Sequence, residues 1–194
     1  MNANTKELIL AAARRTAQAR GYGGLNFRDL AADVGIKAAS IHYYFPSKAD
    51  LGAAVARRYR EDSETALEAL SVEMHDPVAS LRLYPDMFRQ ALENENRMCL
   101  VGFMSAEYDA LPDAVKKEVQ AFTDVNVAWI GRQLSAASLA TAEESVARAR
   151  AIFSAIAGAQ LMARSRSDIA FYDGVIDSYR KSGLLPSKSA AAPS

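Results

Sequence analysis

A group of hydrogen-bond donors and cations follows a tight turn early in the chain. The residues expected to face outward from a short helix there are Lys37, Ala38, Ala39, Ser40, His42 and Tyr43. Lysine and serine side chains can hydrogen-bond to base edges in a DNA major groove, and alanine methyl groups can contact thymine methyl groups. A second group is better placed for phosphates, which fix register without reading sequence. Its members are Asn26, Arg28, His42 and Lys48.

These side chains need two helices packed across a tight turn, and residues 27–48 have that pattern. Ala31, Gly35 and Ile41 lie at i, i+4 and i+10, where a helix-turn-helix is sterically tightest. Gly35 can take the positive φ of the turn at little steric cost. The apolar residues expected between the helices are Leu30, Val34, Ile36, Ile41 and Phe45. The segment therefore predicts a helix that lies in a major groove; the alternative is a solvated polar face on an ordinary three-helix unit.

Charge is distributed unevenly, although the formal net charge of the 194 residues is +0. Residues 1–50 hold seven Lys and Arg against four Asp and Glu, a balance of +3, and the remainder has a balance of −3. A basic N-terminal part suits phosphate contact, because the electrostatic attraction acts only where charge approaches the DNA backbone.

Several classes of protein are disfavoured. No apolar run approaches the roughly 20 residues needed to span a bilayer, and the N-terminus lacks the features of a secretory signal. Cys99 is the only cysteine, which fits a reducing compartment, so we expect a cytoplasmic protein with no membrane partner. The sequence has no Gly-rich phosphate loop, catalytic serine motif or zinc motif, and its only histidines, His42 and His75, fall on different elements. We therefore expect no enzyme, no cofactor and no metal.

Periodicity predicts helices nearly throughout, because glycine and proline are scarce and Ala-rich stretches repeat every 3.6 residues. The expected helices are about 5–20, 27–34, 38–44, 48–73, 77–93, 97–109, 112–137, 142–165 and 169–182. The capping and boundary signals are Gly21, Asn26, Ser47, Pro112 at a first helical position, Thr141 with Glu144, and Ser167 or Asp168. The expected domains are a helix-turn-helix DNA-binding domain (1–47), a helical ligand-binding and dimerisation domain (48–184) and a flexible tail (185–194).

The first 51 residues resemble the N-terminal domain of TetR-type transcriptional regulators. The resemblance rests on Ile9-x2-Ala-Ala13, Gly21-Tyr22, Phe27-Arg-Asp-Leu-Ala31, Val34-Gly35 and Ile41-His-Tyr-Tyr-Phe-Pro-Ser-Lys48 with Leu51. It implies an all-α fold of about nine helices, in which a three-helix DNA-binding domain is joined through a long helix to a helical ligand-binding and dimerisation domain. Two residues depart from the family pattern: His42 replaces a common tyrosine, and Ala17 replaces a bulky aromatic.

The resemblance also implies an effector cavity in the helical body. Aromatic and methionine side chains suit a mostly apolar pocket, and core packing is the alternative for each of them. The candidate lining residues are Tyr59, Tyr84, Met87, Phe88, Cys99, Phe103, Met104, Tyr108, Phe122 and Trp129. The expected effector is a small apolar or electrophilic molecule.

Two stripes near the C-terminus suggest a homodimer, which a two-fold operator in double-stranded DNA requires. Their residues are Ala151, Ala155, Gly158, Met162, Ile169, Tyr172, Ile176 and Tyr179. The resemblance implies an intermolecular four-helix bundle, and the alternative is packing on the chain's own core.

The sequence thus predicts a homodimeric repressor that a small molecule releases from its operator. We expect segment 45–59 to transmit the effect of the ligand to the DNA-binding domain. A 100-fold loss of operator affinity needs about 2.7 kcal/mol of coupling free energy between the two sites. One alternative is a repressor that senses electrophiles or oxidants through Cys99. Another is a DNA-bound scaffold whose body recruits a protein partner. No residue distinguishes repressor from activator.

Overall fold

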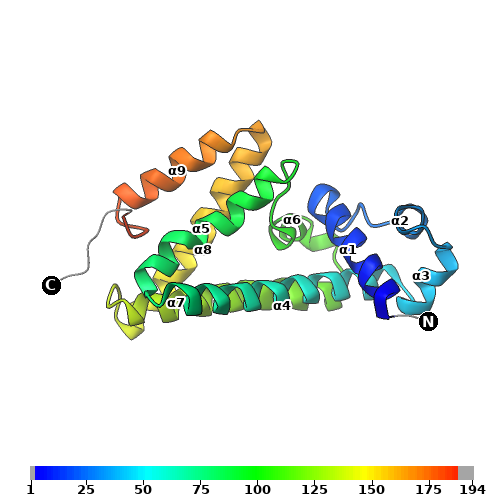
Figure 1. The fold of residues 1–194 in the computed structure, drawn as a ribbon, viewed down its shortest axis with the longest axis horizontal. Coiled ribbons are helices and arrows are strands. Elements are labelled where there is room, and N and C mark those ends of the chain that lie inside the picture. Colours follow the sequence, from blue (N-terminus) through cyan, green and yellow to red (C-terminus); the bar gives the residue numbers. More distant parts are fainter. Residues whose placement is uncertain (1–2, 188–194) are drawn as a thin grey trace. The chain divides into compact units, whose positions relative to one another are not determined.

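The computed structural model describes residues 3–187 and is all-α over that range, with no β-strand among the described residues (Figure 1). The α-helices are α1 (Ala3–Arg20), α2 (Phe27–Val34), α3 (Ala38–Tyr44), α4 (Lys48–Met74), α5 (Pro77–Glu93), α6 (Leu100–Ala106), α7 (Asp113–Ala136), α8 (Ala142–Arg166) and α9 (Ile169–Lys181), with a 3-10 helix η1 (Tyr108–Ala110) after α6. The all-α prediction is confirmed. Most of the predicted tail, residues 188–194, lies outside the described residues.

Local capping explains several of these boundaries. α1 is followed by Gly21, whose φ of +71° is in the left-handed region that favours glycine. Before α4, Ser47 Oγ accepts a hydrogen bond from the Asp50 N–H at 3.2 Å, while the Asp50 carboxylate accepts one from the Ser47 N–H at 3.0 Å. Thr141 and Glu144 form the predicted capping box before α8. These side chains satisfy N–H groups that the first turn of a helix leaves without partners.

Two predicted boundaries need correction, and a third is resolved between its two candidates. The helix expected over 97–109 is shorter: α6 starts after Cys99, which is extended (φ −49°, ψ 124°), and gives way at Glu107 to η1. At this residue the Glu107 carboxylate makes a long-range contact with the Tyr22 and Gly23 N–H groups, described below. Pro112 precedes the first residue of α7, and its carbonyl accepts the hydrogen bond from Lys116 N–H. Of the two candidate caps for α9, Asp168 is the one used.

The chain divides into two compact units. The first contains the described residues up to Ser63 together with Cys99–Thr123, and the second contains Glu64–Met98 and the described residues from Asp124 onward. Within the first unit, α1, α2 and α3 pack together as a three-helix group that we call the head (Figure 1, blue to cyan). The predicted functional boundary at residue 47 stays a prediction.

The head is built around a small buried core. The fully or nearly fully buried residues there are Ile9, Ala12, Ala13, Ala17, Leu25, Leu30, Ala31, Ile41 and Phe45. Alanines at four of these positions let the helices approach closely. Burial of each large apolar side chain stabilises the fold by roughly 1.5–3 kcal/mol, so a few contacts hold the short helices in place.

The second unit has a larger aromatic and polar interior. The Tyr84 ring stacks on Trp129 with 5.5 Å between centroids, and its hydroxyl donates to Asn126 Oδ1 at 2.9 Å. α8 and α9 lie side by side in this unit (Figure 1). The Tyr172 hydroxyl of α9 donates to the Pro85 carbonyl of α5 at 2.8 Å. These hydrogen bonds satisfy buried polar groups that would otherwise destabilise the core.

Candidate nucleic-acid interface

The turn between α2 and α3 has the predicted geometry. Gly35 follows α2 with φ 76° and ψ 33°, and the Ile36 N–H donates to the Ala31 carbonyl at 2.9 Å, which closes the helix end. Leu30 and Ile41 are buried between the helices, as predicted. Val34, by contrast, is only half-buried. The tight turn therefore orients α3 across α2 and leaves one face of α3 outside the core.

That face of α3 is open to solvent. Lys37, Ala39 and His42 are exposed, and Tyr43 has 67% of its surface accessible. Ala38 and Ser40 belong to the same helix but are half-buried. The exposed surface of the Tyr43 ring is therefore accessible to a binding partner.

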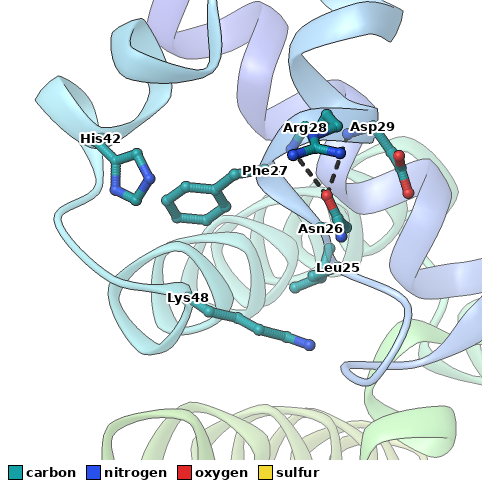
Figure 2. Close-up of a pocket in the computed structure, with 7 residues that line it drawn as sticks. All are labelled: Leu25, Asn26, Phe27, Arg28, Asp29, His42 and Lys48. Carbon is teal, nitrogen blue, oxygen red and sulfur yellow. Dashed lines mark hydrogen bonds between the residues drawn. The ribbon is translucent and has the colours of Figure 1, made fainter.

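A surface groove of about 730 Å³ brings together all four predicted phosphate residues (Figure 2). It is lined by Leu25, Asn26, Phe27, Arg28, Asp29, His42 and Lys48. The His42 ring lies 4.6 Å from the Phe27 ring between centroids, so α2 and α3 meet at this groove. The groove therefore joins the start of α2, the end of α3 and the start of α4.

Two of the groove residues already have structural roles. Asn26 caps α2, because its Oδ1 accepts hydrogen bonds from the N–H groups of Arg28 and Asp29 at 2.8 and 3.3 Å (Figure 2). Because Oδ1 is used in the cap, Nδ2 is the group through which the Asn26 side chain can contact a phosphate. Lys48 Nζ donates to the Gly23 carbonyl at 3.0 Å and lies 4.8 Å from the centre of the Tyr22 ring. Its ammonium group is held at the edge of the groove.

Other cations of the first unit are committed to ion pairs within the chain. Arg14 lies 2.8 Å from Asp62, and Arg15 lies 2.8 Å from Asp33. Charges paired in this way attract DNA weakly at a distance. Lys37 and Lys48, which reach the surface beside α3, are consequently the lysines best placed to attract DNA.

The predicted ligand-lining residues do not fall in one unit. Tyr59, Cys99, Phe103, Met104, Tyr108 and Phe122 belong to the first, whereas Tyr84, Met87, Phe88 and Trp129 belong to the second. Tyr108 is 43% exposed, and the Lys116 ammonium lies 4.7 Å from the centre of its ring. Trp129 is packed in the core and donates through Nε1 to Ser71 Oγ at 2.9 Å. The ligand-binding assignment remains a prediction.

Cys99 occupies a buried position in the first unit. Burial raises the pKa of its thiol, and its side chain hydrogen-bonds with that of Tyr59. Burial also raises the pKa of the Tyr59 hydroxyl well above its ordinary value. The Arg14 guanidinium lies 4.7 Å from the centre of the Tyr59 ring. Both groups are therefore protonated at neutral pH, which makes Cys99 a poor resting nucleophile.

The predicted dimer stripes are only partly at the surface. On α8, Ala151, Gly158 and Met162 are exposed, with 47% of the Met162 surface accessible. On α9, Tyr172 and Ile176 are 1% and 2% exposed, so these two assignments are corrected. They face the chain's own core because α9 packs on α5 as well as α8.

Sequence reasoning missed several features of the second unit. Asn126 and Gln160 are buried polar residues, and Gln160 Nε2 donates to the Phe88 carbonyl at 2.7 Å. Val146 and Leu161 are exposed apolar residues on α8. The sequence does indicate the burial of Asn126 and Gln160, because each lies on an otherwise apolar face of its helix.

The described residues offer neither a membrane-spanning helix nor a metal-binding cluster. None of the described helices combines the length and the hydropathy that a lipid bilayer demands of a spanning helix. Over the same described residues, no group of three or more His, Cys, Asp or Glu side chains is arranged to hold a metal ion.

Comparison with known proteins extends over nearly the whole chain. The profile of the family described as "Bacterial regulatory proteins, tetR family" matches residues 9–55. A TetR transcriptional regulator from Legionella pneumophila is 32% identical, with 94% of this chain and 99% of that chain covered and a TM-score of 0.87. A TetR-family regulator from Agrobacterium tumefaciens is 27% identical, with coverages of 89% and 93% and a TM-score of 0.82. An uncharacterized HTH-type transcriptional regulator from Lactococcus lactis subsp. lactis is 26% identical over 173 residues, 86% of each chain.

Proposed function

This chain belongs to the TetR family of transcriptional regulators, and from that premise we propose that it is a homodimeric repressor released from its operator by a small-molecule effector. The observation that carries the proposal is the exposed face of α3 beside a groove that gathers four phosphate-binding candidates. α3 is proposed to read base edges through Lys37, Ala38, Ala39, Ser40 and Tyr43. Asn26, Arg28, His42 and Lys48 are proposed to hold the backbone.

A homodimer is supported by the exposed apolar surface of α8. Leu161 and Met162 are adjacent there, and Val146 lies nearer the start of the helix. Ala151, Gly158 and Met162 keep their proposed role at the interface, with half-buried Ala155, Ile169 and Tyr179 at its margin. One recognition helix reads too few bases for useful specificity, so a dimer on a two-fold operator fits the physical requirement.

The effector is proposed to act on the helical body formed by residues 48–184. The candidate lining is rich in aromatic rings and methionine, which favours a small apolar or electrophilic molecule. Such a molecule lowers operator affinity only if it binds the conformation that does not bind DNA more tightly. We further propose that the protein acts in the cytoplasm and has no enzymatic activity, because its relatives are transcriptional regulators.

The experiment is a selection of duplexes from a random-sequence library on the purified native protein. Enrichment of a two-fold symmetric duplex, together with a mass of two protomers in light scattering, is the expected result. Failure to enrich any duplex at low ionic strength would contradict the proposal. A thermal-shift screen of apolar and electrophilic compounds then tests the effector, because a compound that stabilises the protein is expected to lower its affinity for the selected duplex.

The alternative of a redox repressor acting through Cys99 has less support. Cys99 is 5% exposed and burial raises the pKa of its thiol, whereas a sensor thiol needs solvent access and thiolate character. The test is release of the selected duplex by a quinone or hypochlorite. Release that persists in Cys99→Ser would eliminate the alternative, and release that is lost in this variant would favour it.

A further inference from the structure

The turn that joins α1 to α2 is held by a carboxylate from a distant part of the sequence. Glu107 Oε2 accepts a hydrogen bond from the Tyr22 N–H at 2.6 Å, and Glu107 Oε1 accepts one from the Gly23 N–H at 3.1 Å. Glu107 is the residue between α6 and η1, 85 positions from Tyr22. Hydrogen bonds from N–H groups to an ionised carboxylate are stronger than neutral ones. The contact therefore ties the end of α6 to the head, within the first compact unit.

The turn is shaped to receive this carboxylate. Gly21 has a positive φ, and a Cβ atom added to it would overlap the Glu107 carboxylate group. A Cβ atom at Gly23 would lie 3.1 Å from Glu107 Oε1. The two glycines consequently leave the space that the carboxylate fills, and the same space would be closed by ordinary side chains.

The same turn also holds a candidate DNA contact. The Gly23 carbonyl accepts the hydrogen bond from Lys48 Nζ, and the Lys48 ammonium faces the Tyr22 ring. The Tyr22 ring in turn packs where Gly52 of α4 has no side chain, since a Cβ atom there would come within 2.6 Å of the ring. Glu107 and Lys48 thus bind adjacent peptide groups of one turn, Glu107 through N–H groups and Lys48 through a carbonyl.

We infer that Glu107 is a positioning residue for DNA binding: its carboxylate fixes the Tyr22–Gly23 turn, which holds Lys48 at the groove where a phosphate binds. The inference rests on the proposed function. Because Glu107 ends α6, a displacement of α6 withdraws the carboxylate from the turn and weakens the Lys48 contact. The end of α6 is then a route by which the helical body lowers operator affinity.

The test compares Glu107→Gln with the matched control Asp109→Asn. Both variants remove one negative charge, but Asp109 is an exposed residue of η1 two positions away. The probe is the duplex selected by the native protein, and affinity is measured by fluorescence anisotropy over a salt series. Glu107→Gln is expected to bind about tenfold more weakly, with a salt slope smaller by about 0.9, the value for one phosphate contact. Asp109→Asn is expected to bind as the native protein does or slightly more tightly.

A double-mutant cycle separates positioning from a general structural role. If Glu107 acts through Lys48, then Lys48→Ala with Glu107→Gln binds no more weakly than Lys48→Ala alone. Additive losses, or equal behaviour of Glu107→Gln and Asp109→Asn, would overturn the inference. So would a loss of helicity in Glu107→Gln, because the role would then be purely structural. If the native protein selects no duplex, the proposed function itself is contradicted. If the native protein binds a duplex and Glu107→Gln binds it equally well, only the inference about Glu107 is contradicted.

Discussion

The two compact units place their polar side chains in opposite environments. In the first unit, Asn26, His42 and Lys48 line a surface groove, and their donors face solvent or the edge of the groove. In the second unit, Asn126 and Gln160 are buried and hydrogen-bonded to Tyr84 and to the Phe88 carbonyl. Polar side chains thus serve a surface in one unit and a core in the other, and asparagine occurs in both settings.

The difference teaches that binding and stability are separable in this protein. Removing an exposed donor leaves no buried group without a partner, so it changes the free energy of unfolding little. Removing a buried donor leaves its acceptor desolvated and unpaired, which destabilises the fold. Substitutions in the groove, other than at the α2 cap Asn26, are therefore expected to change DNA affinity, and substitutions in the second unit to change stability.

The largest expected effect is on the core of the second unit. Trp129→Ala removes a ring that is stacked on Tyr84 and that donates to Ser71, so it is expected to lower the free energy of unfolding by about 3–5 kcal/mol. Urea denaturation followed by circular dichroism measures this loss. A loss below about 1 kcal/mol would show that this interior is loosely packed, as an open effector cavity requires.

The next largest expected effect is on DNA affinity, at an exposed residue of the first unit. Tyr43→Ala truncates an exposed side chain on α3, so the free energy of unfolding is expected to stay within about 0.5 kcal/mol of that of the native protein. Affinity for the selected duplex is expected to fall by about 1–3 kcal/mol, as for loss of a base contact. Unchanged anisotropy titrations would remove Tyr43 from the proposed interface.

A smaller stability change is expected from a single buried hydroxyl. Tyr84→Phe keeps the ring but removes the hydroxyl that donates to Asn126 Oδ1. Because the buried Asn126 amide loses this donor, the free energy of unfolding is expected to fall by about 1–2 kcal/mol. Thermal unfolding measures the change, and duplex affinity provides the internal control. A variant as stable as the native protein would show that Asn126 finds another donor.

The smallest effect is a pH dependence at the start of α8. Hydrogen bonds from Thr141 lower the pKa of the Glu144 carboxyl, so ionised Glu144 stabilises the folded state above its unfolded pKa. That contribution is lost as the pH falls through the folded pKa. Glu144→Gln is therefore expected to show a shallower loss of stability on acidification than the native protein. Parallel curves of melting temperature against pH for the two proteins would contradict the expectation.

Features that depend on a few neighbouring residues were predictable from the sequence. The Asn26 cap, the Gly35 turn and the Thr141–Glu144 capping box all follow from residue types at fixed short spacing. The outward face of α3 was predictable for the same reason, because helical periodicity places its polar residues together.

Features that depend on distant partners were not predictable. Periodicity correctly put Tyr172 and Ile176 on one face of α9, but it could not decide whether this face meets a partner chain or, as it does, α5 of the same chain. The Glu107 contact joins residues 85 positions apart and lies at the end of α6, inside the helix predicted over 97–109. Long-range packing decided both cases, as it commonly overrides local preference.

The most direct test of the central claim is hydroxyl-radical footprinting of the selected duplex with the native protein at low ionic strength. A dimer that places two α3 helices in successive major grooves predicts two protected patches of backbone, related by a two-fold axis and about one helical turn apart. Uniform cleavage along the duplex at saturating protein would contradict the assignment of α3 and its groove as the DNA-binding surface.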